Sequence, residues 1–232
     1  HRLCLLVCVV CVAFYVANLN SLQIGQHVDD SVYISLARSL NSGLGYVRFE
    51  DPAHPAEPQY PPAMAYLIAA MLAISGGNLE ALRLIPLLFS LASLPLAYLF
   101  FLRRIPDQLD IARSTWAAVL LSLFGLNHLI VGYAGMVMTE APFVCLTLAA
   151  AVWLDRLDAS GNAGIRQASP AISPCTSAGW IVGMAGILAV CCLMRTVAYT
   201  YLVAATLWLW CIRRRRTAIA VAPLTVIALI PW

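Results

Sequence analysis

Long uncharged apolar runs alternate with shorter polar segments along this chain. Seven such runs cover residues 3–17, 84–102, 115–138, 141–154, 177–194, 196–212 and 217–232. Several approach the ~20 residues that an α-helix needs to cross the hydrocarbon core of a bilayer. Uncharged runs of this length are typical of membrane spans. The pattern predicts an all-α fold, namely a polytopic membrane bundle of about seven transmembrane helices.

An eighth apolar run, residues 61–77, is shorter, because its uncharged core covers only 63–75. The distribution of arginine decides whether it spans, since Arg-rich short loops stay on the cytoplasmic side. If 61–77 lies in the interface, most of the 14 basic residues, all of them Arg, fall on one side. That side then holds Arg2, Arg103, Arg104, Arg113, Arg156, Arg166 and Arg213 to Arg216. We therefore predict an interfacial helix at 61–77.

This topology predicts an integral, multi-pass membrane protein with one transmembrane domain, residues 1–232. The segment 18–81 becomes the first non-cytoplasmic loop, with juxtamembrane helices. The Gly-, Ser- and Pro-containing segment 157–177 becomes a flexible cytoplasmic loop. The composition, 62% hydrophobic and 11% charged, agrees with this class. The net charge of +3 comes from loop arginines and does not indicate a nucleic-acid partner.

A polar island, residues 27–46, opens the first loop with the sequence HVDDSVYISLARSLNSGLGY. Asp30 and Ser31 are residue types that cap helices, because their side chains accept from backbone amides of the first turn. A short amphipathic helix follows, and Gly43 is suited to ending it in a left-handed conformation. We expect this helix to lie in the membrane interface with its apolar face down and to hold Asp29 and Asp30 at the surface. A role in capping alone is the alternative for both aspartates.

The segment 48–62 contains five prolines and is expected to be extended, with few backbone hydrogen bonds. His54 and Glu57 are weak candidates for a metal pair, and a hydrated loop with unrelated polar residues is the alternative. Tyr60-Pro61-Pro62 leads into the interfacial helix, and proline is favourable at a helix start.

These motifs resemble those of the GT-C class of integral-membrane glycosyltransferases, including bacterial relatives of the dolichyl-phosphate-mannose protein mannosyltransferases and the lipid A aminoarabinose transferase. The resemblance begins with His27-Val28-Asp29-Asp30 and Gly43-Leu44-Gly45-Tyr46, followed by Tyr60-Pro61-Pro62. Weaker parts are Glu80-Ala81-Leu82-Arg83-Leu84, Met138-Thr139-Glu140-Ala141-Pro142-Phe143 and Leu193-Met194-Arg195-Thr196. The chain would then be the N-terminal part of a family member.

The resemblance implies transfer of a sugar from a polyprenyl-phosphate donor to a hydroxyl of a protein, lipid or glycan, with inversion. The reaction would take place at the outer face of a bacterial inner membrane. The attacking hydroxyl must lose a proton, and a carboxylate within hydrogen-bond reach can take it. Asp29 is the candidate base, and Asp30 would orient the acceptor or share the charge. The cofactor requirement stays open, with a divalent metal as one possibility.

Four further residues are candidates for substrate binding. Arg195 and then Arg83 are candidates for the leaving phosphate, because the guanidinium fork matches phosphate oxygens. For Arg195 the alternative is a side chain that reaches the lipid headgroups. Glu140, flanked by apolar runs, would contact the donor sugar, a metal or Arg195, and the alternative is a hydrated interfacial carboxylate. Tyr60 completes the set.

Two other function classes remain open on the sequence. A transporter or lipid flippase predicts ionisable residues at mid-membrane and broken helices. His128 is the main ionisable residue inside a run, and we expect it to be a packing histidine. A multi-span assembly protein would not need the acidic first loop. Convergence of Asp29, Glu140 and Arg195 would favour the enzyme.

Overall fold

The computed structural model describes residues 2–19, 28–106, 112–164, 178–212 and 214–230. These residues are mainly α-helical and form no β-strand, apart from an isolated bridge between Val47 and Ala56. The all-α prediction is therefore confirmed. The chain forms two compact units, His1–Cys145 and Leu146–Trp232.

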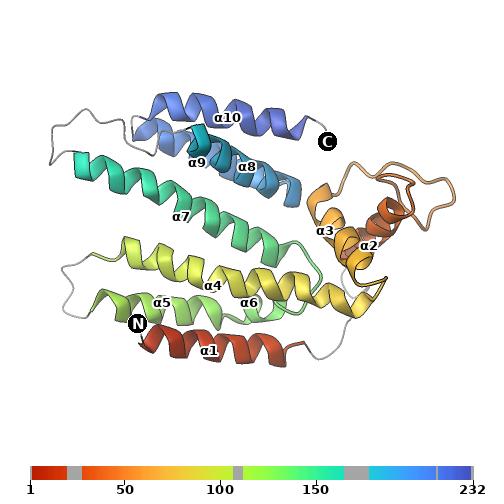
Figure 1. Ribbon diagram of the computed structural model, residues 1–232, viewed down its shortest axis with the longest axis horizontal. Helices are drawn as coiled ribbons and strands as arrows, with labels where there is room; N and C mark the ends of the chain where they lie inside the picture. The colour runs from red at the N-terminus through yellow and green to blue at the C-terminus, as the bar shows by residue number, and fades with distance from the viewer. Residues whose placement is uncertain (1, 20–27, 107–111, 165–177, 213, 231–232) are drawn as a thin grey trace. The chain divides into compact units, whose positions relative to one another are not determined.

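Most of the helices lie in the apolar runs of the sequence, and Figure 1 labels them. The first unit contains α1 (Arg2–Ala17), α2 (Val28–Asn41), α3 (Pro62–Ile74), the 3₁₀-helix η1 (Leu79–Arg83), α4 (Leu84–Arg104), α5 (Arg113–Gly125), α6 (His128–Tyr133) and the first residues of α7 (Glu140–Gly164). The second contains the rest of α7, α8 (Ala178–Met194), α9 (Ala198–Cys211) and α10 (Arg215–Leu229).

Helices α1, α4 and α5 pack together in the first unit. Cys11 of α1 and Leu121 of α5 are fully buried, and Leu94 of α4 is nearly so. Gly125, the last residue of α5, lies against this contact, where a Cβ atom would be 2.6 Å from the Cys11 Sγ. The missing side chain at Gly125 is therefore what allows α1 and α5 to approach so closely.

Helices α2 and α3 form a second packed pair in the same unit. The buried residues of α3 recur at helical spacing and lie on one face: Met64, Ala65, Ile68, Ala69 and Leu72. The apolar residues Tyr33, Leu36 and Ala37 of α2 are also buried. They pack within the protein itself, whereas the sequence suggested a face turned toward the membrane.

The two ends of α2 compare differently with the sequence prediction. At its end, Leu44 N donates to Ser39 O at 3.1 Å and Gly43 N donates to Leu40 O at 3.2 Å, with Gly43 at φ 78°. This is the Schellman arrangement, and it confirms the predicted glycine stop. The start differs from the prediction, because α2 already begins at Val28. Asp30 therefore lies inside the first turn and is not the capping residue.

The run 115–138, predicted as one span, is divided into α5 and α6. Asn127 begins α6, and its side chain accepts from Leu129 N at 2.9 Å. Asparagine is among the best residues for starting a helix, because its short side chain satisfies a free backbone amide. His128 is the first residue of α6 and is exposed, so the expectation of a packing histidine in mid-helix is wrong.

We expect Asn127→Ala to destabilise α6, because the Leu129 amide loses its acceptor. The cost should be about 1 kcal/mol, the usual loss for a capping side chain. Asn127→Asp keeps the acceptor and should preserve stability within a few tenths of a kcal/mol. Unfolding titrations of the three proteins in detergent would measure this difference. An equal loss in both variants would contradict the capping role.

The segment Leu79–Arg104 is the only described helical stretch that is both long and apolar enough to cross a membrane by length and composition. Four described apolar helices are shorter: α1, α3, α8 and α9. The described residues therefore confirm that the fold is helical, whereas the seven-span bundle stays a prediction. Helix α7 continues to Gly164, so the start of the segment 157–177 is helical. Residues 165–177 lie outside the described part.

The second unit is built on the packing of α10 against α8 and α9. Leu188 of α8, Leu209 of α9 and Val221 of α10 are its most buried aliphatic side chains. Trp153 of α7 lies against Gly183 of α8, where a Cβ atom would be only 2.8 Å from the indole ring.

Candidate functional site

The two aspartates of the first loop have different surroundings. Asp29 is exposed, whereas Asp30 is only 3% exposed. Both lie in the first turn of α2, where the positive end of the helix dipole stabilises a carboxylate. Asp30 Oδ1 accepts from Ser31 N at 2.6 Å. Asp29 is thus the carboxylate that an incoming molecule can reach, and Asp30 belongs to the folded scaffold.

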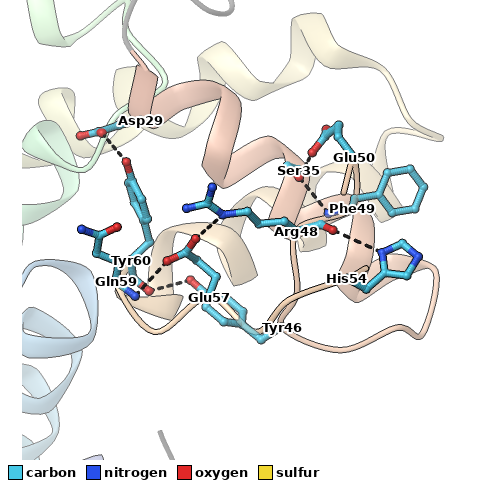
Figure 2. Close-up of polar contacts among 10 residues, drawn as sticks. All are labelled: Asp29, Ser35, Tyr46, Arg48, Phe49, Glu50, His54, Glu57, Gln59 and Tyr60. Atoms are coloured by element: carbon cyan, nitrogen blue, oxygen red, sulfur yellow. Dashed lines mark hydrogen bonds and ion pairs between the residues drawn. The ribbon is translucent and has the colours of Figure 1, made fainter. Parts of the chain in front are cut away.

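Asp29 is held by the other end of the loop. The Tyr60 hydroxyl donates to Asp29 Oδ1 at 3.0 Å, although the two residues are 31 positions apart (Figure 2). Both residues belong to the motifs predicted for the site, so the fold brings two predicted site residues into direct contact. A hydrogen bond of this kind orients the carboxylate and leaves its second oxygen for another partner.

Tyr60 is itself fixed from two further directions. Its ring packs edge-to-face on the Tyr33 ring, with the centroids 5.3 Å apart. Its carbonyl oxygen accepts from the Tyr46 hydroxyl at 2.8 Å. The next residue, Pro61, is the N-cap of α3. The phenol therefore has little freedom to leave Asp29.

The surroundings of Tyr60 raise the pKa of its phenol above the usual 10.0, through burial first and then through the hydrogen bond to Asp29 and its charge. The folded protein thus holds the phenol proton more tightly than the unfolded chain. This contribution to stability is present below pH 10 and is lost as the pH rises through the higher folded-state pKa.

We expect the Asp29–Tyr60 hydrogen bond to persist to pH 10 and above. In Asp29→Asn, the Tyr60 pKa should fall toward 10, because the negative acceptor is gone. Titration of ¹³Cζ-labelled tyrosine by NMR measures this, with Tyr60→Phe assigning the resonance. An unchanged Tyr60 pKa in Asp29→Asn would contradict the contact.

The segment between Tyr46 and Tyr60 folds back on itself, so the prediction of an extended segment is wrong. Arg48 N donates to Pro55 O at 3.2 Å, and Glu57 N donates to Tyr46 O at 3.4 Å. His54 makes the reversal possible with a positive φ of 44°. Proline removes amide donors, but here the non-proline amides suffice to close the loop.

An ion pair between a buried carboxylate and a half-exposed arginine closes this loop. Glu57 is 3% exposed and pairs with the Arg48 Nε, and its other oxygen accepts from Gln59 N at 3.0 Å (Figure 2). The His54 ring faces the Arg48 carbonyl, with Nδ1 at 3.3 Å. Because Arg48 and Gln59 already engage Glu57, the arrangement disfavours His54 and Glu57 as a metal pair. No described cluster of three or more His, Cys, Asp or Glu side chains could hold a metal ion.

Two open clefts border the loop. One, of about 720 Å³, is lined by Ser31, Val32, Ser35, Arg48, Glu50, Asp51 and Pro52. The other, of about 570 Å³, runs along Arg48 and residues 55–59. The buried Ser35 hydroxyl accepts from Phe49 N at 3.1 Å and donates to Glu50, which fixes the floor of the first cleft. Arg48 lines both clefts.

The other predicted site residues lie on different elements. Arg83 ends η1, pairs with Glu80 and donates to Leu19 O at 2.8 Å, so it ties η1 to the end of α1. Glu140 is the first residue of α7 and is partly buried. Arg195 lies between α8 and α9 in the second unit and is also partly buried. Their convergence with Asp29 stays a prediction.

Sequence reasoning assigned no structural role to four residues that organise the loop: Arg48, Glu57 as its ion-pair partner, Ser35 and Tyr46, which was quoted only as part of a motif. Arg48 stood out only as one of the few arginines outside the basic side. Its place between two glycines and five prolines was a usable signal, because prolines leave such a segment few backbone donors and a side-chain contact adds to them.

Comparison with known proteins finds no match: no protein-family model, curated protein or solved structure is significantly similar to this chain.

Proposed function

We propose that this protein is a GT-C type membrane glycosyltransferase, which moves a sugar from a polyprenyl-phosphate donor to a hydroxyl acceptor with inversion. The proposal places the reaction at the non-cytoplasmic face of a bacterial inner membrane. One observation carries it: the exposed carboxylate of Asp29 accepts a hydrogen bond from Tyr60 at 3.0 Å. The two motifs behind the family resemblance thus meet in one contact, and Ser31, two residues after Asp29, lines an open cleft.

In this reaction Asp29 takes the proton of the acceptor hydroxyl as the oxygen attacks the anomeric carbon. The bond from that carbon to the phosphate oxygen breaks, and the phosphate leaves with the electron pair. A hydrogen bond from Tyr60 to one carboxylate oxygen directs the other oxygen toward the acceptor. Asp30, buried beside the backbone, holds the turn in shape.

A location in the membrane is supported by the surface of the apolar helices. Seven large apolar side chains of α1 are exposed: Leu3, Leu5, Leu6, Val9, Val12, Phe14 and Val16. Exposed apolar surface on this scale is unfavourable in water and favourable against lipid tails. Outward-facing valine, leucine and isoleucine also occur on α9 and α10, for example Val203, Leu207 and Ile227.

A transporter is the second candidate, and one observation favours it. The break between α5 and α6, with the exposed His128 next to it, is the kind of interrupted helix that lines transport sites. The two functions differ in whether a covalent bond to the substrate is broken.

The test uses the full chain in vesicles with a radiolabelled polyprenyl-phosphate sugar and a mixture of hydroxyl acceptors. A transferase produces labelled acceptor and free polyprenyl phosphate. Movement of label across the vesicle with the donor intact would instead establish transport. Neither product nor movement over a panel of hexosyl and aminosugar donors would reject the proposal.

A further inference from the structure

We propose that Arg48 is an anion-binding residue of the Asp29 site and takes the phosphate oxygens of the lipid-linked donor. The inference rests on the proposed function for the identity of the donor. It differs from the sequence expectation, which gave this role to Arg195 and Arg83. Within the described residues, Arg83 is already engaged by Glu80 and by the Leu19 carbonyl.

Arg48 has donors to offer. Its Nε pairs with Glu57, whereas its two terminal nitrogens make no hydrogen bond to any described side chain or backbone group. The side chain is 47% exposed. Guanidinium presents its donors in a rigid plane that matches two phosphate oxygens, and this makes an arginine with a free fork a suitable phosphate ligand.

The Arg48 side chain lies on the side of the loop that faces Tyr60 (Figure 2). Figure 2 shows its side chain extending from the loop toward Glu57 and Tyr60, the partner of Asp29. Its charge reaches the Tyr60 hydroxyl, where it opposes the burial and the Asp29 charge that raise the phenol pKa. Arg48 also lines the cleft to which Ser31, two residues after Asp29, contributes.

The ion pair with Glu57 holds the Arg48 guanidinium in one position. The Glu57 carboxylate is buried and is held by Gln59 N, so it fixes the guanidinium through Nε and leaves the outer fork free. A cation fixed before the ligand arrives loses little conformational entropy on binding. The cost is that Glu57 neutralises part of the charge, and Glu50 and Asp51 line the same cleft. This balance favours a single phosphate group over a diphosphate.

The test measures binding of radiolabelled farnesyl phosphate to the full chain in a neutral detergent by equilibrium dialysis. The decisive variant is Arg48→Gln/Glu57→Gln, which removes the cation without leaving a buried carboxylate unpaired. Loss of hydrogen bonds to a charged group predicts binding about ten- to hundredfold weaker. Arg38→Gln, an exposed arginine on α2, should bind like the unaltered protein. Glu57→Gln alone should retain binding, because the amide oxygen can still accept from the Arg48 Nε and position the guanidinium.

Competition with inorganic phosphate shows whether the site recognises the phosphate group or the lipid chain of farnesyl phosphate. If it displaces farnesyl phosphate only when Arg48 is present, the site recognises the phosphate group itself, as proposed. Unchanged farnesyl phosphate binding in the double variant, or no binding to the unaltered protein, would overturn the inference. Because binding needs no turnover, Arg48-dependent binding without sugar transfer rejects the proposed function alone. Transfer with Arg48-independent binding rejects the anion site alone.

Discussion

Asp29→Asn should reduce sugar transfer by the full-length protein about a hundred- to ten-thousandfold, the usual effect of losing a positioned general base. The asparagine side chain keeps the shape of aspartate and still accepts from the Tyr60 hydroxyl, so the loop should keep its fold. What it cannot do is accept the acceptor's proton at neutral pH. The loss should therefore appear in kcat rather than in donor binding.

The control is Glu80→Gln, which removes an exposed carboxylate of the same unit outside the Asp29–Tyr60 contact. Its transfer rate should stay within about twofold, because the Glu80 carboxylate is 62% exposed and a solvated carboxylate contributes little through its ion pair. Labelled acceptor formed per minute by equal amounts of folded protein is the measurement. Full activity of Asp29→Asn would show that Asp29 is not the general base, whatever the result for Glu80→Gln.

Gly125→Ala should destabilise the first unit by about 1–3 kcal/mol, the usual cost of overpacking a close helix contact. The new methyl group would lie 2.6 Å from the Cys11 Sγ and 3.0 Å from the Leu94 Cδ2. Since Cys11 is fully buried, its sulfur has no free space to move into, and α1 must shift away from α5. Titration of the folded protein with a denaturing detergent would measure the loss.

Removing the sulfur should restore part of this stability. In a Cys11→Ala background the nearest cysteine atom at the contact is gone, so Gly125→Ala should cost less than it does alone. Gly186 on α8 is the control, because a Cβ atom there meets nothing within 4 Å. Gly186→Ala should be neutral or slightly stabilising. Equal costs at both glycines would show that helix propensity, rather than contact, determines the result.

The fold was predictable where local chemistry decides it. Apolar runs placed the helices, and Gly43 placed the end of α2. The break at Asn127 was missed because an apolar run of 24 residues outweighed a capping signal that the sequence does contain. The start of α2 was placed too late, because Asp30 has the chemistry of a cap but lies in the first turn.

The candidate site was predictable only where its residues belong to recognisable motifs. Asp29 and Tyr60 came from motifs, and the fold brings them together. The pairing of Arg48 with Glu57 depends on a chain reversal at His54, a non-glycine residue with positive φ, and no simple pattern predicts that conformation. Tertiary contacts of this kind are visible only after the loop has closed.

The contact between Asp29 and Tyr60 also bears on the order of assembly. Its two ends are 31 residues apart, and the loop bonds that support it close within the same stretch of chain. Contacts between residues close in sequence form early, because they confine little intervening chain. During synthesis, the acid and its phenol partner are therefore able to meet while α4 and the helices after it have not yet been made.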